Sequence, residues 1–342
     1  MDLQSANRKL VTGQDLTRAE MQDVMSLIMH GEATPAQIGS FLTALMIKGE
    51  TVEEIVGAAT IMRELAATVE TKAERVVDTV GTGGDVAKLF NVSTACALVA
   101  CAAGAHVAKH GNRAATGNSG SADVLEAAGV NIAISPAQVG QCIDQVGIGF
   151  MFAPTHHAAT RHAIGPRREI GVRTIFNLLG PLTNPANARY QLVGVFDQKW
   201  VVPIAEVFAA LGSIHTLVVC SDDGTDEISL AAGTEAAELK NGKVEKFRIE
   251  PESFGIKKAS MEPLTVRDSA HSLELIQEAL KGTPGLAYDM VALNAGATLY
   301  AADLADNIAA GVELAREVLN SGQALDKLSD LAKLTSSFEE DS

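Results

Sequence analysis

The feature that most constrains the fold is an alternation, starting at residue 76, between short apolar runs and segments with a helical pattern. The apolar runs cover residues 76–80, 106–108, 148–152, 192–196 and 216–220, and the helical segments include 92–103, 121–128 and 201–211. Strands that alternate with helices form a mostly parallel sheet covered by helices. The alternation therefore predicts an α/β domain over residues 73–342.

The pattern changes late in this domain. Asn241 and Gly242 separate two short strand-like runs, and an Asn-Gly pair in this position is a strong signal for a type I′ hairpin. The region 265–320 predicts helices and one more strand at 290–293. We therefore expect an antiparallel hairpin after the parallel strands, and a frayed acidic tail over 339–342.

The first 72 residues read as a separate helical unit. Thr17, Thr34 and Thr51 each stand three residues before Glu or Gln, which is the spacing of a capping box at a helix start. Apolar residues recur at helical spacing after the first and third of these threonines, and the first stripe is rich in methionine. Such a stripe forms either a core or a subunit interface. The pattern predicts a small helical domain over residues 1–72.

Composition and charge restrict the possible partners. The 342 residues are 47% hydrophobic and 20% charged, so the chain can build a large core and is not disordered. A formal net charge of −15 gives no general attraction to nucleic acid or to an anionic membrane surface. Any phosphate must then be held by backbone amides, a few cations or a metal. The four cysteines lack metal-type spacing and the N-terminus lacks a signal-peptide pattern, so we expect a cytoplasmic protein with free thiols.

The first candidate ligand site is Gly81-Thr82-Gly83-Gly84-Asp85, directly after the first predicted strand. It is followed by Asn91-Val92-Ser93-Thr94 at the start of a helix. Glycines let the backbone approach a phosphate closely, and a helix N-terminus offers unpaired N–H groups. The hydroxyls of Ser93 and Thr94 can bind a phosphate or its metal. The alternative is a tight turn between a strand and a helix, because the spacing matches neither a dinucleotide fingerprint nor a P-loop.

A second candidate, residues 109–123, follows the second predicted strand. Two cations, a histidine and an asparagine stand here among glycines and hydroxyl residues. In open α/β sheets, ligands bind at the carboxyl ends of the strands, where this segment would lie. Lys109 can neutralise phosphate charge, and the amides and hydroxyls of 116–121 can surround anionic oxygens. The segment predicts an anion-binding loop that leads into a helix starting at Ser121.

A third candidate is the acidic run over residues 222–227, after the fifth predicted strand. Clustered carboxylates are oxygen ligands suited to Mg²⁺, which takes one or two of them together with phosphate oxygens. A solvated acidic turn is the alternative. The two predicted anion-binding loops favour the metal.

A fourth segment lies between the third and fourth predicted strands. His156 and His157 are adjacent, so they do not form the helical pair of a metal site. Arg167 follows Gly165-Pro166, which we expect to be a turn before the next helix. The Arg167 guanidinium can bind a carboxylate in a bidentate fork or form a surface ion pair with Glu169, and the sequence leaves both open.

Six segments in this order resemble the anthranilate phosphoribosyltransferase family, and the resemblance covers nearly the whole chain. They are GTGGD (81–85), NVST (91–94), KHGNRA (109–114), GSAD (120–123), RTIFNLLGPLTNP (173–185) and DE (226–227). The resemblance implies transfer of the phosphoribosyl group of 5-phospho-α-D-ribose 1-diphosphate (PRPP) to the amine of anthranilate. Pyrophosphate is released, and the step belongs to tryptophan synthesis. The implied fold is a small helical domain hinged to a larger α/β domain and rejoined by residues 167–189, with a homodimer formed through the helical domain.

The same resemblance implies the site residues. The implied PRPP site consists of Gly81, Gly84, Asp85, Leu89, Asn91, Val92, Ser93, Thr94, Lys109, His110, Gly111, Asn112, Arg113, Ala114, Ala115, Thr116, Gly117 and Ser121. The implied anthranilate contacts are Gly81, Asn112, Arg167 and His157, and the implied catalytic residues are Lys109, His110, Asn112 and Arg167. Ser93, Asp226 and Glu227 are the implied ligands of Mg²⁺, at two ions per subunit.

The chain departs from the family pattern at four positions. Leu89 stands where a Ser or Thr usually contacts PRPP, and Gly117 replaces a frequent Ser. Ala158 and Thr160 differ from the usual residues near the implied anthranilate entry path. The Leu89 side chain cannot make the usual PRPP contact, Gly117 offers only its backbone amide, and the changes at Ala158 and Thr160 remove no charge and no metal ligand.

Two other classes of protein compete with this interpretation. A pyrimidine nucleoside phosphorylase has a related architecture and uses phosphate as its nucleophile, but the KHGNRA segment and Arg167 argue against it. A non-enzymatic nucleic-acid-binding relative is opposed by the net charge and by the intact Asp226-Glu227 pair. Displacement at the ribose C1 requires stabilisation of the departing pyrophosphate, and the aromatic amine is neutral at pH 7. The absence of a nucleophile–base pair in the sequence agrees with that chemistry.

Overall fold

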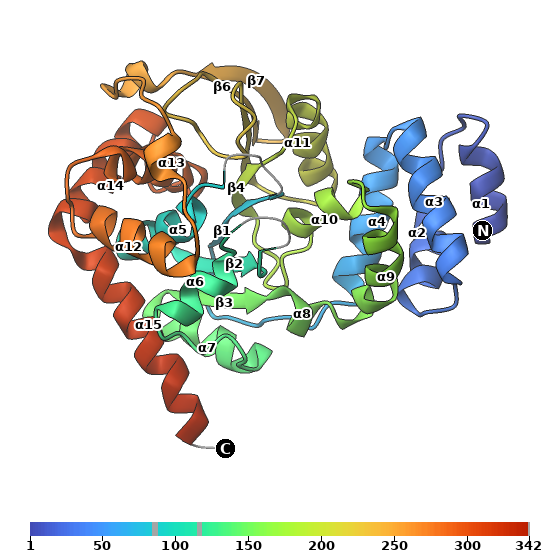
Figure 1. Cartoon of the computed structure of the whole chain (residues 1–342), viewed down its shortest axis with the longest axis horizontal. Coiled ribbons are helices and arrows are strands. Elements are labelled where there is room, and N and C mark those ends of the chain that lie inside the picture. Colours follow the sequence, from blue (N-terminus) through green and yellow to red (C-terminus); the bar gives the residue numbers. More distant parts are fainter. Residues whose placement is uncertain (84–87, 115–117, 341–342) are drawn as a thin grey trace.

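A seven-stranded sheet forms the centre of the computed structural model, which describes residues 1–83, 88–114 and 118–340 (Figure 1). The strands are β1 (Val76–Gly81), β2 (His106–Gly111), β3 (Ile148–Phe152), β4 (Tyr190–Gly194), β5 (His215–Ser221), β6 (Thr234–Lys240) and β7 (Lys243–Ile249). Their order across the sheet is β3-β2-β1-β4-β5-β6-β7. The pairs from β3 to β5 are parallel, and β6 and β7 are antiparallel. The predicted fold class, including the hairpin at Asn241-Gly242, is confirmed.

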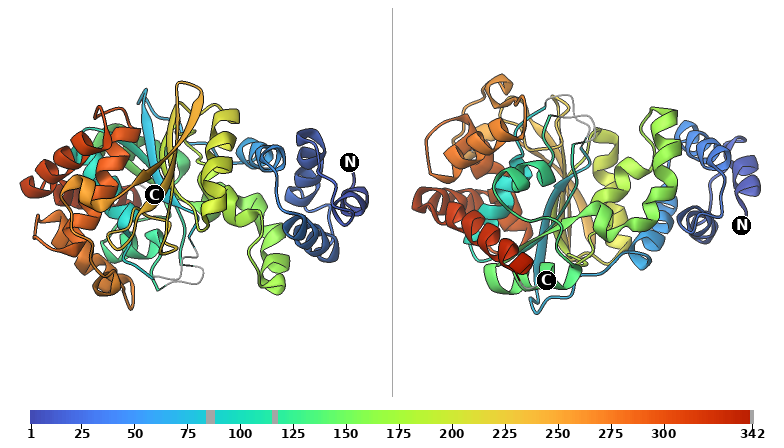
Figure 2. Two further views of the ribbon diagram at one scale, coloured as in Figure 1. Left: turned by 90° about the horizontal axis from the view of Figure 1, so that it is seen from above. Right: turned by 60° about the horizontal axis from the view of Figure 1, so that its bottom comes forward.

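Helices cover both faces of the sheet (Figure 2). One layer contains α5 (Val92–Ala102), α6 (Ser121–Ala127), α7 (Pro136–Val146), α12 (Ser269–Leu280), α13 (Leu286–Ala301), α14 (Ile308–Ser321) and α15 (Gln323–Glu340). The other contains α10 (Phe176–Leu182) and α11 (Val201–Ala210). Side chains alternate along each strand, so Leu217 and Val219 pack into the first layer while Val218 and Cys220 pack into the second. The buried strands are therefore apolar on both faces.

The N-terminal helices are α1 (Leu3–Leu10), α2 (Arg18–Met29), α3 (Pro35–Lys48) and α4 (Val52–Glu64). The capping boxes predicted at Thr17, Thr34 and Thr51 are all present at the starts of α2, α3 and α4. Helix α1 was not predicted, because its cap is a single hydrogen bond from Ser5 N to the Asp2 carboxylate without a capping box. The methionine stripe that includes Met21 lies in the buried core of this part of the molecule.

Segments from the middle of the chain pack against these helices. Helix α8 (Ala153–His156) and the short turn Ala158–Thr160 lead to α9 (Arg161–Ile170), which contacts α2 and α3. Helices α10 and α11 contact α4. Phe176 and Leu179 belong to the same buried cluster as Phe41. Figure 1 shows α9 and α10 beside α4.

Three segments connect the N-terminal helices and the helices packed on them to the sheet. They lie before β1, after β3 and before β4, and hydrogen bonds join them to one another. Ala67 N donates to His156 O at 2.9 Å, and Val69 N donates to Pro185 O at 3.0 Å. The Arg63 guanidinium donates to Leu182 O at 2.6 Å. Segments distant in sequence are thus fastened together where the two parts meet. The division of the chain at residue 72 remains a prediction.

The predicted strand at 290–293 is wrong, because these residues lie inside α13. All four side chains are fully buried. A helix buried on every side has no amphipathic period, so a short window of it looks like a buried strand. The fourth strand begins and ends two residues earlier than predicted, at 190–194. Residues 339 and 340 of the predicted tail end α15, and 341–342 lie outside the described residues.

Helices α13 and α14 cross at two glycines. A Cβ added at Gly296 would lie 2.6 Å from Val312 N, and one added at Gly311 would lie 2.2 Å from Gly296 O. The two backbones therefore touch without intervening side chains. By contrast, Gly39 in α3 has no atom within 4 Å of an added Cβ.

We predict opposite effects of alanine at these positions. Gly296→Ala forces the two helices apart and should lower the free energy of unfolding by about 1–3 kcal/mol. Gly39→Ala should raise it by about 0.5–1 kcal/mol, since alanine favours an open helix position over glycine. Urea unfolding of both variants measures the difference. A Gly296→Ala protein as stable as the wild type would contradict the close crossing.

Candidate active site at the carboxyl edge of the sheet

Four of the predicted loops lie at one edge of the sheet, because the carboxyl ends of parallel strands meet there. From β1 the chain proceeds to β2 and β3 on one side, and later to β4 and β5 on the other. The crevice between the ends of β1 and β4, where Gly81 pairs with Gly194, is therefore a topological switch point. Open α/β sheets bind their ligands at such a point.

The Asp226 residue packs directly against the glycines at this crevice. A Cβ added at Gly81 would lie 2.2 Å from Asp226 Oδ2, and one added at Gly194 would lie 1.6 Å from Asp226 O. Gly83 N donates to Asp226 Oδ2 at 2.8 Å. Burial raises the pKa of Asp226, while the Gly83 amide and the charge of Arg173 act in the opposite direction. The first glycine motif thus makes room for a carboxylate from another loop.

The acidic run divides into two halves with different partners. Asp222 pairs with Arg248 and accepts from Gln198, and Asp223 accepts from Thr225 and Ser229. These first two carboxylates therefore stabilise the loop itself. Asp226, by contrast, is buried, and Glu227 is half-buried.

The donor set at the edge fits a hard cation. Asp226, Glu227 and the Ser93 hydroxyl offer only oxygen atoms, which Mg²⁺ prefers. Among the described residues, no three His, Cys, Asp or Glu side chains gather closely enough to hold a metal. A cation here would need hydroxyl, water or substrate oxygens to complete its coordination.

Lys109 links the first two motifs. Its side chain is only 2% exposed, and its Nζ donates to Thr79 O at 2.8 Å and to Ser93 Oγ at 3.1 Å. Burial lowers the pKa of Lys109, and the charges of Asp78 and Glu227 oppose that shift. The ammonium group is thus held beside the Ser93 hydroxyl.

The second loop is closed by Asp123. Its carboxylate accepts hydrogen bonds from Ala114 N at 3.0 Å and from Gly120 N at 2.9 Å. Burial acts to raise the pKa of Asp123, but these two amides and the Arg113 guanidinium hold it below its usual value. Arg113 also pairs with Glu126 and lies over the Phe152 ring. The predicted PRPP residue Arg113 is therefore engaged with α6 in this structure.

Asn91 is also fully engaged. Its Oδ1 accepts from Ser119 Oγ at 2.7 Å and from Ser272 Oγ at 2.8 Å, and its Nδ2 donates to Ser119 O at 3.1 Å. Asn91 thereby holds the second loop against α12. Asn112 is exposed, and its carbonyl accepts from Ala122 N at 3.2 Å.

Two buried histidines adjoin the loops. The rings of His110 and His157 lie 5.1 Å apart, and His110 Nδ1 contacts Gly180 O at 3.2 Å. Burial and mutual repulsion with neighbouring histidines lower the pKa of His110 to about 3 and that of His157 to about 4. Both rings are therefore neutral near pH 7.

Several buried polar atoms at this edge have no hydrogen-bond partner in the described structure. They are the hydroxyls of Thr82 and Thr94 and the Nε2 atoms of His110 and His157. Buried polar groups are almost always paired. Their concentration beside the loops indicates a place where a polar ligand binds.

Arg167 lies in the last turn of α9, and the predicted turn at Gly165-Pro166 is wrong because both residues are inside that helix. Its guanidinium carbon is 4.9 Å from the centre of the Phe176 ring. Burial lowers the pKa of Arg167. No described carboxylate forms an ion pair with Arg167, whereas Arg168 and Glu169 are exposed. The structure thus favours a free guanidinium over the surface pair with Glu169.

The remaining predicted residues fall into two groups. Leu89 is half-buried against the main core and bridges to Thr265. Gly111, where the second loop leaves β2, lies beside Ser121, where the loop enters α6. Outside the described residues lie Gly84, Asp85, Ala115, Thr116 and Gly117. The sequence analysis assigns no role to Asp78 or Asn184, which are buried and hydrogen-bond to each other. The available signal was an aspartate inside an apolar strand.

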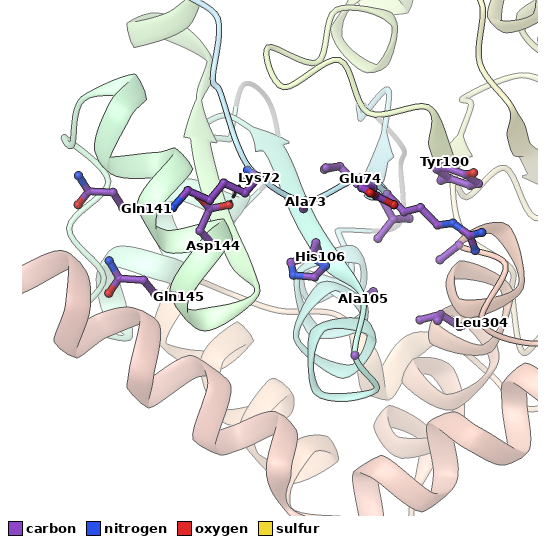
Figure 3. A pocket seen from close by; sticks show the side chains of 15 residues that line it. Lys72, Ala73, Glu74, Ala105, His106, Gln141, Asp144, Gln145, Tyr190 and Leu304 are labelled. Carbon is purple, nitrogen blue, oxygen red and sulfur yellow. Dashed lines mark hydrogen bonds between the residues drawn. The ribbon is translucent and has the colours of Figure 1, made fainter.

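A cavity of about 640 Å³ lies at the opposite edge of the sheet (Figure 3). Its lining includes the first residues of β1, β2 and β4, namely Val76, His106 and Tyr190. Among the described residues, none of those predicted from the sequence as site residues lines this cavity. It is therefore separate from the candidate active site.

The described part of the chain also contains no helix that is both long and apolar enough to cross a membrane.

Comparisons with known proteins agree with this geometry. Residues 4–66 match the model of the glycosyl transferase family, helical bundle domain, and residues 73–325 match the glycosyl transferase family, a/b domain. The chain is 56% identical over 337 residues to an anthranilate phosphoribosyltransferase of Thioalkalivibrio sulfidiphilus, covering 98% of this chain and 100% of that protein.

Solved structures give the same result. The crystal structure of anthranilate phosphoribosyltransferase from Thermus thermophilus superimposes with a TM-score of 0.92 at 42% identity, covering 97% of this chain and 99% of that one. The Saccharomyces cerevisiae enzyme in complex with PRPP and Mg gives a TM-score of 0.90 at 27% identity, covering 98% of both chains. The chain therefore belongs to the anthranilate phosphoribosyltransferase family.

Proposed function

We propose that this chain transfers the 5-phosphoribosyl group of PRPP to the amine of anthranilate. The anthranilate nitrogen bonds to the ribose C1 as the bond from C1 to the pyrophosphate oxygen breaks, and the amine releases a proton. The main support is the position of two contacts at the carboxyl edge of the sheet, beside unpartnered hydroxyls: Lys109 Nζ donates to Ser93 Oγ, and the Asp226 carboxylate lies against Gly81. The yeast relative, whose structure holds PRPP and Mg, agrees with it.

PRPP would occupy the crevice formed by the first two loops. The Lys109 ammonium and the loop amides would stabilise the negative charge that develops on pyrophosphate. Asp226, Glu227 and Ser93 would hold Mg²⁺, which when bound neutralises phosphate charge. Two ions per subunit remain a prediction, and metal analysis of the PRPP-bound protein measures their number.

Anthranilate would be oriented by Arg167. A planar guanidinium without a carboxylate partner matches the carboxylate of anthranilate. His110 Nδ1 donates to Gly180 O, so the unpartnered Nε2 of this neutral ring can accept one hydrogen bond without adding charge, and the ring of His157 also has its Nε2 free. No strong base is required because the amine is neutral, so positioning and leaving-group stabilisation supply the rate enhancement.

One assay tests the proposed function directly. Anthranilate fluorescence should fall when PRPP and Mg²⁺ are added, and pyrophosphate should appear in equal amount. Release of ribose 1-phosphate from a nucleoside and phosphate would instead show a pyrimidine nucleoside phosphorylase. A gel shift with nucleic acid in the absence of any turnover would support the non-enzymatic class.

The cytoplasmic location of the protein remains a prediction.

We predict that the two inner carboxylates bind the metal. Asp226→Asn combined with Glu227→Gln should lower turnover by about 100-fold or more, and more severely at low Mg²⁺. Asp222→Asn is the matched control, since Asp222 stands in the same loop but pairs with Arg248. Its turnover should equal that of the wild type. Wild-type activity of the double variant across a Mg²⁺ titration would exclude the assignment.

We predict that Arg167 binds the acceptor. Arg167→Ala should weaken the use of anthranilate by about 10–100-fold, the scale of one lost charged hydrogen bond of about 1.5–3 kcal/mol. Arg168→Ala is the control, because Arg168 is exposed on the same helix. Steady-state kinetics with each substrate varied decides between them. Equal losses for both substrates in Arg167→Ala, or a larger anthranilate defect in Arg168→Ala, would defeat the assignment.

We also infer a homodimer formed through the helical part. Val11 is 70% exposed and Ile47 is 75% exposed on that part of the molecule, and such apolar side chains favour an interface. Sedimentation equilibrium should give twice the mass of the chain, and Ile47→Asp should shift the mass toward a single chain. The mass of one chain for the wild type at micromolar concentration would contradict the dimer.

A further inference from the structure

Two central strands of the sheet separate just below the candidate active site. Within the described residues, the paired register of β1 and β2 ends at Val77 and Val107. However, β2 stays paired with β3 through Gly111, and β1 stays paired with β4 through Gly81. Each strand therefore keeps its outer neighbour while the ladder between the two strands stops short of the site.

The backbone groups of β2 that face this gap are paired with side chains. Val107 N donates to Gly147 O on the β3 side, so the backbone groups of Ala108 and His110 face β1. Ala108 O accepts from Asn184 Nδ2 at 2.9 Å, and His110 N donates to the Asp78 carboxylate at 3.3 Å. Side chains thus take the places of the missing ladder hydrogen bonds.

Asp78 and Asn184 also bind each other. Asn184 Nδ2 donates to Asp78 Oδ2 at 2.8 Å, and Asn184 Oδ1 accepts from Ala186 N at 2.9 Å. Asp78 is completely buried and Asn184 is 4% exposed. The pair therefore connects β1, β2 and the segment before β4 in a place that water does not reach.

The hydrogen-bonded pair of Asp78 and Asn184, called the Asp78–Asn184 bridge below, requires a carboxylate at position 78. Asp78 faces two donors, His110 N and Asn184 Nδ2, and only a carboxylate has an acceptor oxygen for each. Burial raises the pKa of Asp78 to about 6, while the nearby Lys109 ammonium and the Asn184 amide act to lower it. Among the charges that act to raise the pKa of the buried Lys109, that of Asp78 has the largest effect.

We propose that the buried Asp78–Asn184 bridge is a positioning device for the transfer reaction, which holds the end of β2 so that Lys109 meets the departing pyrophosphate. Lys109 Nζ reaches across the same gap to Thr79 O, so its position depends on the width that the bridge sets. Asp78 and Asn184 touch no substrate in this scheme. The inference rests on the proposed function.

A reciprocal exchange tests the bridge. Asp78→Asn places an amide against a donor, and Asn184→Asp places a carboxylate against both Asp78 and Ala108 O. In the double variant, the new amide at position 78 donates to the new carboxylate at position 184, and its oxygen still accepts from His110 N. The hydrogen bond to Ala108 O is then lost and a carboxylate oxygen faces that carbonyl, so we expect a partial recovery.

We predict a specific pattern of kinetic constants. Each single variant should lower kcat/KM for PRPP by about 100-fold, with a change in KM for anthranilate within about twofold. The double variant should recover at least about tenfold of that loss. Losses that multiply in the double variant, or wild-type constants in Asp78→Asn, would overturn the proposal.

Two measurements separate positioning from loss of folding and from failure of the proposed function. Val312→Ala, a cavity variant in α14 remote from the site, is the control for destabilisation and should keep the wild-type KM for PRPP. Hydrogen exchange without substrates should be faster over residues 106–111 in Asp78→Asn, and in the milder Asn184→Ala if the first variant does not fold. Unchanged exchange there would overturn the bridge itself. A wild-type protein without turnover would instead overturn the proposed function.

Discussion

The buried ammonium group of Lys109 is the interaction on which the site depends. A charge removed from water costs several kcal/mol unless hydrogen bonds and an opposite charge compensate it. Lys109 obtains the first from Thr79 O and Ser93 Oγ, and the second from Asp78 and Glu227. These partners come from three separate stretches of the chain. The requirement to satisfy one cation therefore brings the first glycine loop, the second loop and the acidic loop to one place.

Glycines allow these loops to meet because they have no Cβ atom. Gly81 and Gly194 end neighbouring strands, and any side chain on either would collide with Asp226. The loop after β5 can therefore lie directly on the ends of β1 and β4. A turn that binds a phosphate and a turn against which a carboxylate packs both require a backbone without Cβ atoms. The phosphate-binding role of the glycine motif stays a prediction, whereas the structure shows the motif in contact with the Asp226 carboxylate.

Local signals made most of the fold predictable. The capping boxes at Thr17, Thr34 and Thr51 and the Asn241-Gly242 hairpin depend on neighbours within a few residues, and all are confirmed. The buried helix at 290–293 was missed because its burial on all sides removes the period that identifies a helix. For the candidate site, the sequence motifs predicted which loops lie at the carboxyl edge of the sheet. They gave no indication of the hydrogen bond between Asp78 and Asn184, which are 106 residues apart.

The three segments between the helices and the sheet have a mechanical consequence. Hydrogen bonds from Ala67 to His156 and from Val69 to Pro185 tie these segments into one narrow bundle. Side-chain packing adds a second connection, because α10 and α11 contact α4 and share one buried cluster with the N-terminal helices. Parts joined both by their connecting segments and by a common core resist separation and rotation alike. Arg167 on the helical side and Lys109 on the sheet side therefore belong to one connected frame, which sets the distance between the acceptor and the phosphate chain.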